Sequence, residues 1–166
     1  MGAVELIGGL SDLLKDKTLL KHAALIGGQW VKAKSGAEFS VINPATGKEI
    51  AKVPNLSAED VKEAIHASEK SFLEWRNITG KERAAILRKW FNLITENTED
   101  LALIMTHEQG KPLAEALGEV VGCADHCDWH AEECRRIYGR VVLPRSPDVR
   151  QLVLKEPIGV CVAFTP

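Results

Sequence analysis

The sequence predicts an α/β fold, and three observations along the chain lead to this prediction. The first third contains short runs of strand-forming residues separated by turns rich in glycine and proline, which is typical of β-hairpins. The middle carries apolar residues at spacings of three and four, the pattern of amphipathic helices. The chain closes on a continuous apolar run, 160–164, that is typical of a strand buried on both faces in a parallel sheet.

Composition narrows the function classes. The 166 residues suffice for one domain with a sizeable core, and 45% hydrophobic with 27% charged residues is ordinary for a globular chain. Lys plus Arg number 21 against 23 Asp plus Glu, so no basic field favours nucleic acid. No apolar run approaches the roughly 20 residues of a membrane span. The acidic residues Glu5, Asp12 and Asp16 suit neither a secretory signal nor a transit peptide, which predicts a cytoplasmic protein.

Two hairpins are predicted in the first third. Gly27 and Gly28 favour a tight turn, because glycine takes positive φ without steric cost. The second turn contains Pro44 and Gly47. An amphipathic segment, 10–20, precedes them and is expected to be a surface helix or a tethered arm. The predicted strands are 23–26 with 29–31 and 39–42 with 49–53.

Helices are predicted next, about four of them. Ser57 and Asp60 have the spacing of a capping box, which satisfies unpaired amides at a helix start. Pro112 suits the first turn of the fourth helix, expected to run to about Tyr138 with Gly139 as its cap. The apolar positions that set the periodicity are Val61, Ile65, Phe72 and Trp75 in the first helix, Ile86, Leu87, Trp90, Phe91 and Ile94 in the second, and Leu101, Ile104 and Met105 in the third.

A third hairpin, 141–143 with 150–155, and the apolar run follow the helices. In an α/β nucleotide-binding fold, the carboxyl end of such a strand turns into the ligand crevice. The chain stops one residue past Thr165, at that point. We therefore expect the front part of a larger fold.

A stripe of cysteine and histidine on the fourth helix raises the question of a metal site. Cys123, Cys127, His130 and Cys134 follow at spacings of four, three and four, with His126 nearby. Eleven residues of helix rise about 16 Å, whereas zinc ligands lie roughly 2.0 to 2.3 Å from one ion. At most an adjacent pair could share a metal. We favour packing, with cysteine as a small hydrophobe and histidine at the edge of a core; a partial metal or redox site with ligands from elsewhere is the alternative.

Catalytic motifs are missing from the sequence. It contains no G-x-G-x-x-G, Walker A loop or G-x-S-x-G elbow. Cys161 lies inside the apolar run, where burial would raise the pKa of its thiol and make it inert. We predict no catalytic residue and no metal ligand in this chain.

Several runs, in order, resemble the aldehyde dehydrogenases. Two further runs are most similar to the succinate-semialdehyde dehydrogenases of that superfamily, and the resemblance extends from Leu25 onward. The superfamily runs are INPATG from Ile42, KERAAILRKWF from Lys81, EQGKPLAEA from Glu108, LKEPIGV from Leu154 and FTP from Phe164; the two others are WHAEE from Trp129 and RIYG from Arg136.

The resemblance implies a fold in three parts: a Rossmann-like cofactor domain, a catalytic domain, and a bridging hairpin that assembles dimers or tetramers. This chain would supply an N-terminal arm, 1–22, the leading part of the cofactor domain, 23–139, the bridging hairpin, 140–156, and the truncated first strand of the Rossmann-like sheet, 157–166. The catalytic domain would be absent.

The chemistry implied by the resemblance is oxidation of an aldehyde, such as succinate semialdehyde, with NAD or NADP. A cysteine thiolate attacks, hydride passes to the nicotinamide, and a glutamate activates water to hydrolyse the thioester. Those residues, and an asparagine that holds the oxyanion, come after Pro166 in the family, so the chain alone is expected to be inactive. Thr165 and Pro166 match a stretch that lines the cofactor, chiefly through backbone. Some relatives bind a cation near Val41 and Glu108, but we favour a plain loop carboxylate for Glu108.

The resemblance leaves alternatives open. Relatives usually carry apolar, aromatic or small residues at the positions of Cys127, His130 and Cys134, which favours packing. A complete enzyme is expected to be a homo-oligomer through the bridging hairpin. The alternative functions are a stand-alone, non-catalytic truncation or interaction module, and a metal-binding helical protein.

Overall fold

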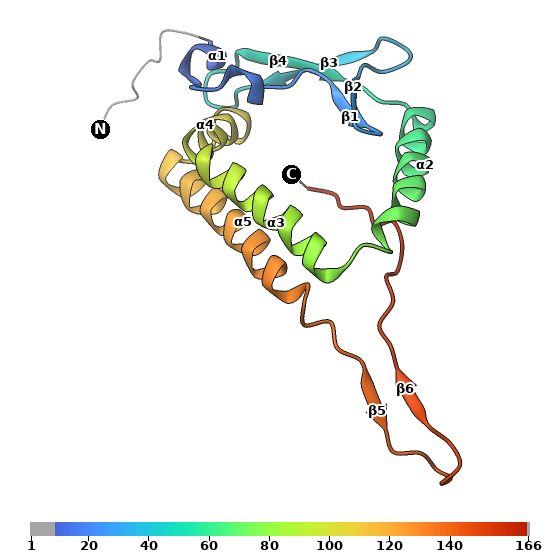
Figure 1. The fold of residues 1–166 in the computed structure, drawn as a ribbon. Coiled ribbons are helices and arrows are strands. Elements are labelled where there is room, and N and C mark those ends of the chain that lie inside the picture. Colours follow the sequence, from blue (N-terminus) through green and yellow to red (C-terminus); the bar gives the residue numbers. More distant parts are fainter. Residues whose placement is uncertain (1–8, 166) are drawn as a thin grey trace.

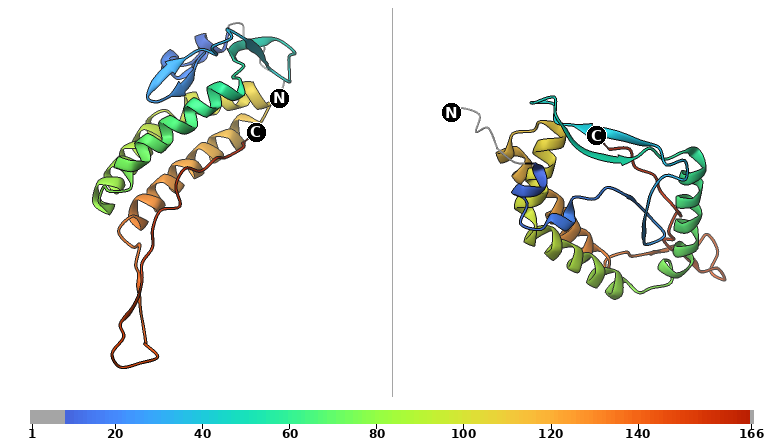
Figure 2. Two further views of the ribbon diagram at one scale, coloured as in Figure 1. Left: turned by 90° about the vertical axis from the view of Figure 1, so that its right-hand side faces the viewer. Right: turned by 90° about the horizontal axis from the view of Figure 1, so that it is seen from above.

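The computed structural model describes residues 9–165 and combines helices with three separate two-stranded antiparallel sheets. Two hairpins lie along one side, four long helices lie beneath and beside them, and the third hairpin projects from the body (Figures 1 and 2). The helices are α1 (Leu10–Leu13), the 3₁₀ turn Lys17–Leu19, α2 (Ala58–Trp75), α3 (Gly80–Glu96), α4 (Thr98–Gln109) and α5 (Leu113–Glu133). The strands are β1 (Ala24–Ile26), β2 (Gln29–Val31), β3 (Glu38–Ile42), β4 (Glu49–Pro54), β5 (Arg140–Val142) and β6 (Gln151–Val153).

All three predicted hairpins are confirmed. Gly27 and Gly28 have φ of 57° and 79°, the left-handed conformation that a tight hairpin turn requires. Strand β3 pairs with β4, with a register shift between Val41 and Ile42. Strand β5 pairs with β6 as the sequence predicted.

The predicted helix starts are also confirmed. The Ser57 hydroxyl accepts from the Asp60 amide, and the Asp60 carboxylate accepts from the Ser57 amide, which completes the capping box of α2. Thr79 and Glu82 form the same arrangement at α3. Gly110 ends α4 with φ of 75°. These local interactions fix where the helices begin and end along the chain.

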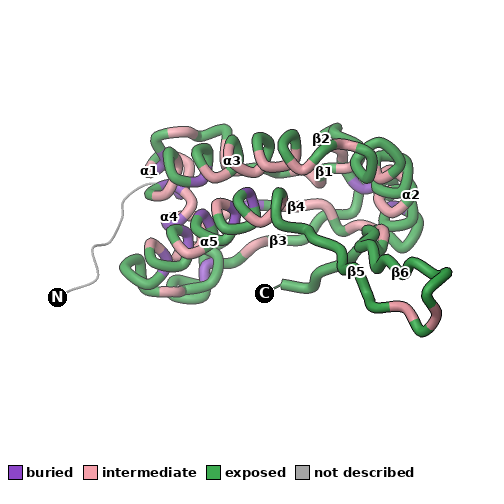
Figure 3. The backbone as a smooth tube through the Cα atoms, turned by 60° about the horizontal axis from the view of Figure 1, so that its bottom comes forward, coloured by how far each residue is buried: buried purple, intermediate pink, exposed green. Residues whose placement is uncertain are grey.

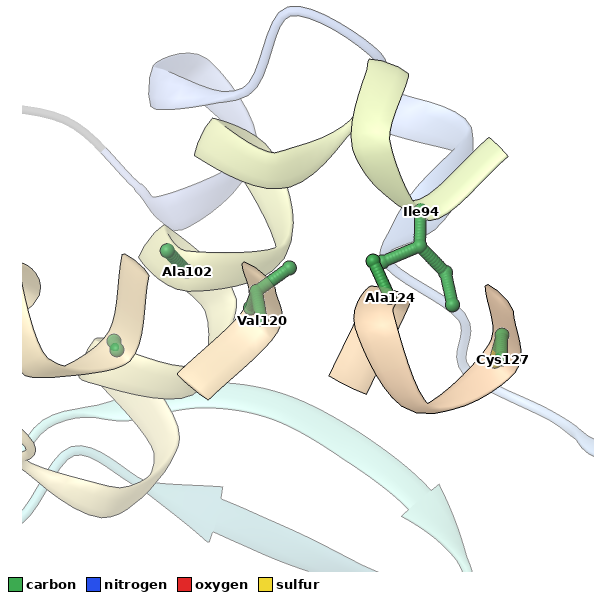
Figure 4. Close-up of a cluster of buried hydrophobic side chains, with 6 residues drawn as sticks. Ile94, Ala102, Val120, Ala124 and Cys127 are labelled. Carbon is green, nitrogen blue, oxygen red and sulfur yellow. The ribbon is translucent and has the colours of Figure 1, made fainter. Parts of the chain in front are cut away.

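The core lies where α3, α4 and α5 meet (Figure 4). Its alanines let the helix backbones approach closely, and Ile94 fills the space between them. Burial is concentrated here, while the third hairpin and the C-terminal segment are exposed (Figure 3). The buried cluster is Ile94, Ala102, Ala116, Val120, Ala124 and Cys127.

Ion pairs add a second tie between α3 and α5. Arg88 on α3 pairs with Asp128 and, at 2.6 Å, with Glu132 on α5. These side chains are partly solvent-exposed, so each pair contributes little, on the order of 1 kcal/mol or less. The pairs therefore orient the two helices more than they stabilise them.

The N-terminal segment packs on α4 and is not one surface helix. Leu10 and Leu14 are buried, at 4% and 5% exposure. The buried Asp100 carboxylate accepts hydrogen bonds from the backbone amides of Lys15, at 3.0 Å, and Asp16, at 2.7 Å. These contacts replace the hydrogen bonds of a longer helix. Residues 1–8 of the predicted arm lie outside the described residues.

The fourth helix ends earlier than predicted, at Glu133 and not near Tyr138. Gly139 is not its cap. A Cβ at Gly139 would overlap the carbonyl oxygen of Val153, so this glycine is required by the close approach of the two chains at the base of the hairpin. The sequence correctly indicated that a glycine is needed at position 139, but the reason is the neighbouring strand and not the end of a helix.

The predicted strand 160–164 is not formed in this structure, and residues 157–165 contain no strand. Val162 and Phe164 are 67% and 97% exposed, and Cys161 is exposed, not buried as predicted. A strand exists only through hydrogen bonds to a neighbour, and no strand in the described part of the chain pairs with this segment.

Among residues 9–165, none of the helices combines the length and the apolar composition that a membrane-spanning helix requires.

Acid is expected to destabilise the chain in part through Asp60. The backbone amide of Ser57, then its hydroxyl, each bonded at 2.8 Å, hold the pKa of Asp60 below its usual value. The folded state therefore binds the proton more weakly than the unfolded state. This stabilisation is present above the usual aspartate pKa of about 3.9 and is lost as pH falls through the lower folded value.

Asp60→Asn should flatten that acid dependence, measured as the urea midpoint between about pH 5 and pH 2. Glu59→Gln is the matched control, because Glu59 is exposed in the same helical turn. An equal change in both variants would contradict the assignment to Asp60.

Candidate functional site

The C-terminal segment returns to the body of the molecule and lies against α2 (Figure 1). Gly159, with φ of 110°, Val160 and Cys161 line a groove together with the β1–β2 turn, α2 and the start of α3. The groove is mainly apolar. Its other apolar lining residues are Leu25, Ala67, Phe72, Trp75, Ile78 and Ile86.

The stripe predicted to be buried on α2 is only partly covered. Ile65 and Phe72 are half-buried, whereas Val61 and Trp75 are 46% and 42% exposed. The sequence found the correct face but could not show how much of it is covered. A partly open apolar face of this kind is typical of an interaction surface.

Tryptophan exposure leads to the same conclusion. Trp30, Trp75, Trp90 and Trp129 are 53%, 42%, 56% and 67% exposed. Tryptophan is usually well buried in a folded chain and is enriched where proteins contact one another. The helical layer therefore presents surfaces suited to packing against further polypeptide.

The predicted cofactor residues lie at the end of this segment. Thr165 is exposed, and Pro166 lies outside the described residues. The backbone of 161–165 has no strand partner among the described residues, so its peptide groups are accessible to a ligand.

The cysteine stripe divides between core and surface. Cys127 is buried against α3, and burial, followed by the proximity of Cys123, raises the pKa of its thiol. Cys123 is exposed and Cys134 half-buried, while His130 is exposed and does not pack at the edge of the core as predicted. Within residues 9–165, no three metal-ligating side chains gather at one point. The packing interpretation therefore holds for Cys127 only.

The end of α4 packs against the β3–β4 turn. The side-chain nitrogen Nδ2 of buried Asn43 lies 3.3 Å from His107 Nδ1. The Asn43 side-chain oxygen Oδ1 accepts a hydrogen bond from the backbone N–H of Ala45. A Cβ at Gly110 would be 2.9 Å from the Pro44 ring. Partial desolvation raises the pKa of Glu108 nearby. This junction is a packed corner, and none of its side chains is arranged as a nucleophile with a base.

The family model for the aldehyde dehydrogenase family matches residues 30–166, most of the chain. The chain belongs to the aldehyde dehydrogenase family. This confirms the resemblance recognised in the ordered sequence motifs, and with it the front part of an α/β fold.

Named relatives agree with this assignment. The chain is 48% identical over 153 residues to a glutarate-semialdehyde dehydrogenase of Pseudomonas putida, and 47% identical to a succinate-semialdehyde dehydrogenase (NADP+) of Escherichia coli. Each comparison covers 92% of this chain and 32% of the relative, so the chain spans about a third of these enzymes.

A solved structure gives the same result for the fold. The succinate-semialdehyde dehydrogenase of Burkholderia pseudomallei superposes with a TM-score of 0.87 at 49% identity, covering 89% of this chain and 31% of that one. Other similar structures include an NADP-dependent enzyme of E. coli and an NAD-dependent aldehyde dehydrogenase of Sinorhizobium meliloti. Family members thus use either dinucleotide.

Proposed function

We propose that this chain is the leading part of the cofactor domain of an NAD(P)-dependent aldehyde dehydrogenase that oxidises a semialdehyde, succinate semialdehyde being the first candidate. The observation that carries the proposal is the identity of 47% to 48% with glutarate- and succinate-semialdehyde dehydrogenases across 92% of the chain. Succinate and glutarate semialdehydes both carry a carboxylate at the end away from the aldehyde, so the proposed substrate class is an ω-carboxylated aldehyde.

The division of the chain follows from this proposal. In this proposal, residues 1–22 would be an arm, 23–139 the leading hairpins and helices, 140–156 a bridging hairpin, and 157–166 a strand that would form when parallel neighbours pair with it. The exposure of Val162 and Phe164 supports the last assignment, because pairing with neighbouring strands would cover these apolar side chains.

Thr165 and Pro166 would hold the cofactor through backbone groups near the nicotinamide ribose. The bound dinucleotide supplies the hydride acceptor of the reaction. The chain's own contribution is to support that segment: α2 and the β1–β2 turn line one groove with Gly159, Val160 and Cys161, and would thereby orient the peptide groups that follow. The chain supplies no nucleophile of its own in this proposal.

The β5–β6 hairpin would assemble a homo-oligomer. It projects beyond the helices (Figure 2), and its apolar side chains have no cover within the described chain. Val141, Leu143 and Leu152 are 83%, 93% and 66% exposed. Pairing such strands with a second subunit would bury these side chains and satisfy the free strand edges.

A cytosolic location would suit the four free cysteines of the chain.

A chimera tests the proposal. Residues 1–166 replace the matching segment of the E. coli succinate-semialdehyde dehydrogenase, and cofactor reduction is followed with succinate semialdehyde. We expect an active, oligomeric chimera, and no reduction of NAD or NADP by the purified 166-residue chain alone. Introducing Val141→Asp and Leu152→Asp together should leave the helices folded and reduce the oligomer.

Two outcomes would count against the proposal. Aldehyde oxidation by the isolated chain would show that it carries its own catalytic groups. A chimera that folds and assembles but is inactive would favour the interaction module instead.

A further inference from the structure

We propose that His126 and His130 on α5 form a two-histidine binding site for a divalent transition-metal ion. The two residues are four positions apart on one continuous helix, Leu113–Glu133, and both are exposed. Residues at this spacing are neighbours on a helix surface, with Cβ atoms about 5–6 Å apart. One ion at roughly 2.0–2.1 Å from each ring nitrogen can therefore bind both imidazoles.

Burial on α5 leaves these histidines outside the core. The face that packs on α3 and α4 comprises Ala116, Val120, Ala124, Cys127 and Ala131. His126 and His130 lie outside that set, so an ion can reach their ring nitrogens without any change in the helix packing.

Most acidic side chains of α5 already have partners, although Asp125, next to His126 in sequence, has none among the described residues. Glu119 pairs with Lys111, Glu133 with Arg136, and Glu132 with Arg88. No side-chain hydrogen bond or ion pair of either histidine is found among the described residues, whereas the His66 ring on α2 contacts Glu69 at 3.1 Å. The two imidazoles of α5 thus keep their lone pairs for a ligand.

The chemistry of the pair selects the kind of ion. Neutral imidazole suits nickel, copper and zinc, and affinity for such sites rises from Ni²⁺ to Cu²⁺. Mg²⁺ and Ca²⁺ prefer oxygen ligands and should not bind. With two protein ligands, water fills the remaining positions, so binding is weaker than at a structural zinc site. This site is independent of the proposed dehydrogenase function.

Titration of the purified 166-residue chain with Ni²⁺, followed by calorimetry, tests the proposal. We expect one ion per chain, and at least tenfold weaker binding in His126→Ala and in His130→Ala. His66→Ala is the matched control and should bind like the original chain. Binding should also weaken as pH falls, because protons compete for the ring nitrogens, and bound Ni²⁺ should raise the melting temperature.

Loss of metal binding can be distinguished from loss of folding. Both histidines are exposed, so the variants should retain the helical content of the original chain, which circular dichroism checks. Absence of Ni²⁺ binding to the original chain would overturn the proposal. So would binding by both α5 variants that is as tight as that of the original chain, or a loss of binding in His66→Ala alone. A loss in Cys123→Ser equal to that in His126→Ala would instead assign the site to a thiol and overturn the two-histidine assignment.

Discussion

Ile94→Ala is expected to lower the free energy of unfolding by about 2–5 kcal/mol, the usual cost of truncating a large buried side chain. Ile94 is 8% exposed and is the largest member of the buried cluster, whose other members are mostly alanines (Figure 4). Small neighbours on α4 and α5 cannot move inward to fill the space that the truncation leaves. Urea unfolding followed by circular dichroism measures the change.

Leu93→Ala is the matched control for this prediction. Leu93 precedes Ile94 in α3 but is 48% exposed, so its truncation removes little buried surface and leaves no closed cavity. We expect a loss well below that of Ile94→Ala. Equal losses would mean that the core does not lie between α3, α4 and α5.

Features set by local interactions could be predicted from the sequence. The Gly27-Gly28 turn requires only the conformational freedom of its own residues, and the capping box of Ser57 and Asp60 requires only groups three positions apart. Such signals are complete within a few residues. They therefore gave the correct hairpins and helix starts.

Features that depend on distant partners could not be predicted in the same way. The end of α5 is set by contact with other elements, since the Cys134 carbonyl lies against Gly80. The run 160–164 has the composition of a buried strand, but composition does not supply the neighbouring strands, and the segment is irregular and exposed here.

In the candidate site, too, local sequence patterns predicted some features, while others depended on packing between helices. Family membership followed from ordered motifs and was confirmed. The state of each cysteine and histidine on α5 depended on which side of the helix faces α3, and a rotation of 100° per residue places Cys127 in the core and His130 outside it. Spacing alone could group these side chains but could not show which of them would be buried.

Gly80→Ala is expected to cost about 1–3 kcal/mol of stability, because the added methyl group overpacks a contact between two backbones. A Cβ at Gly80 would overlap the Cys134 carbonyl oxygen and lie 3.2 Å from its carbonyl carbon. Backbone atoms at the end of α5 cannot rotate away, so α3 and α5 must separate. Gly118→Ala on α5 is the matched control: it has open space around it, and alanine favours helix by roughly 0.5–1 kcal/mol. Opposite signs of the two changes, measured as melting temperatures, are the expected result, and a gain in both variants would place the ends of α3 and α5 further apart than this structure does.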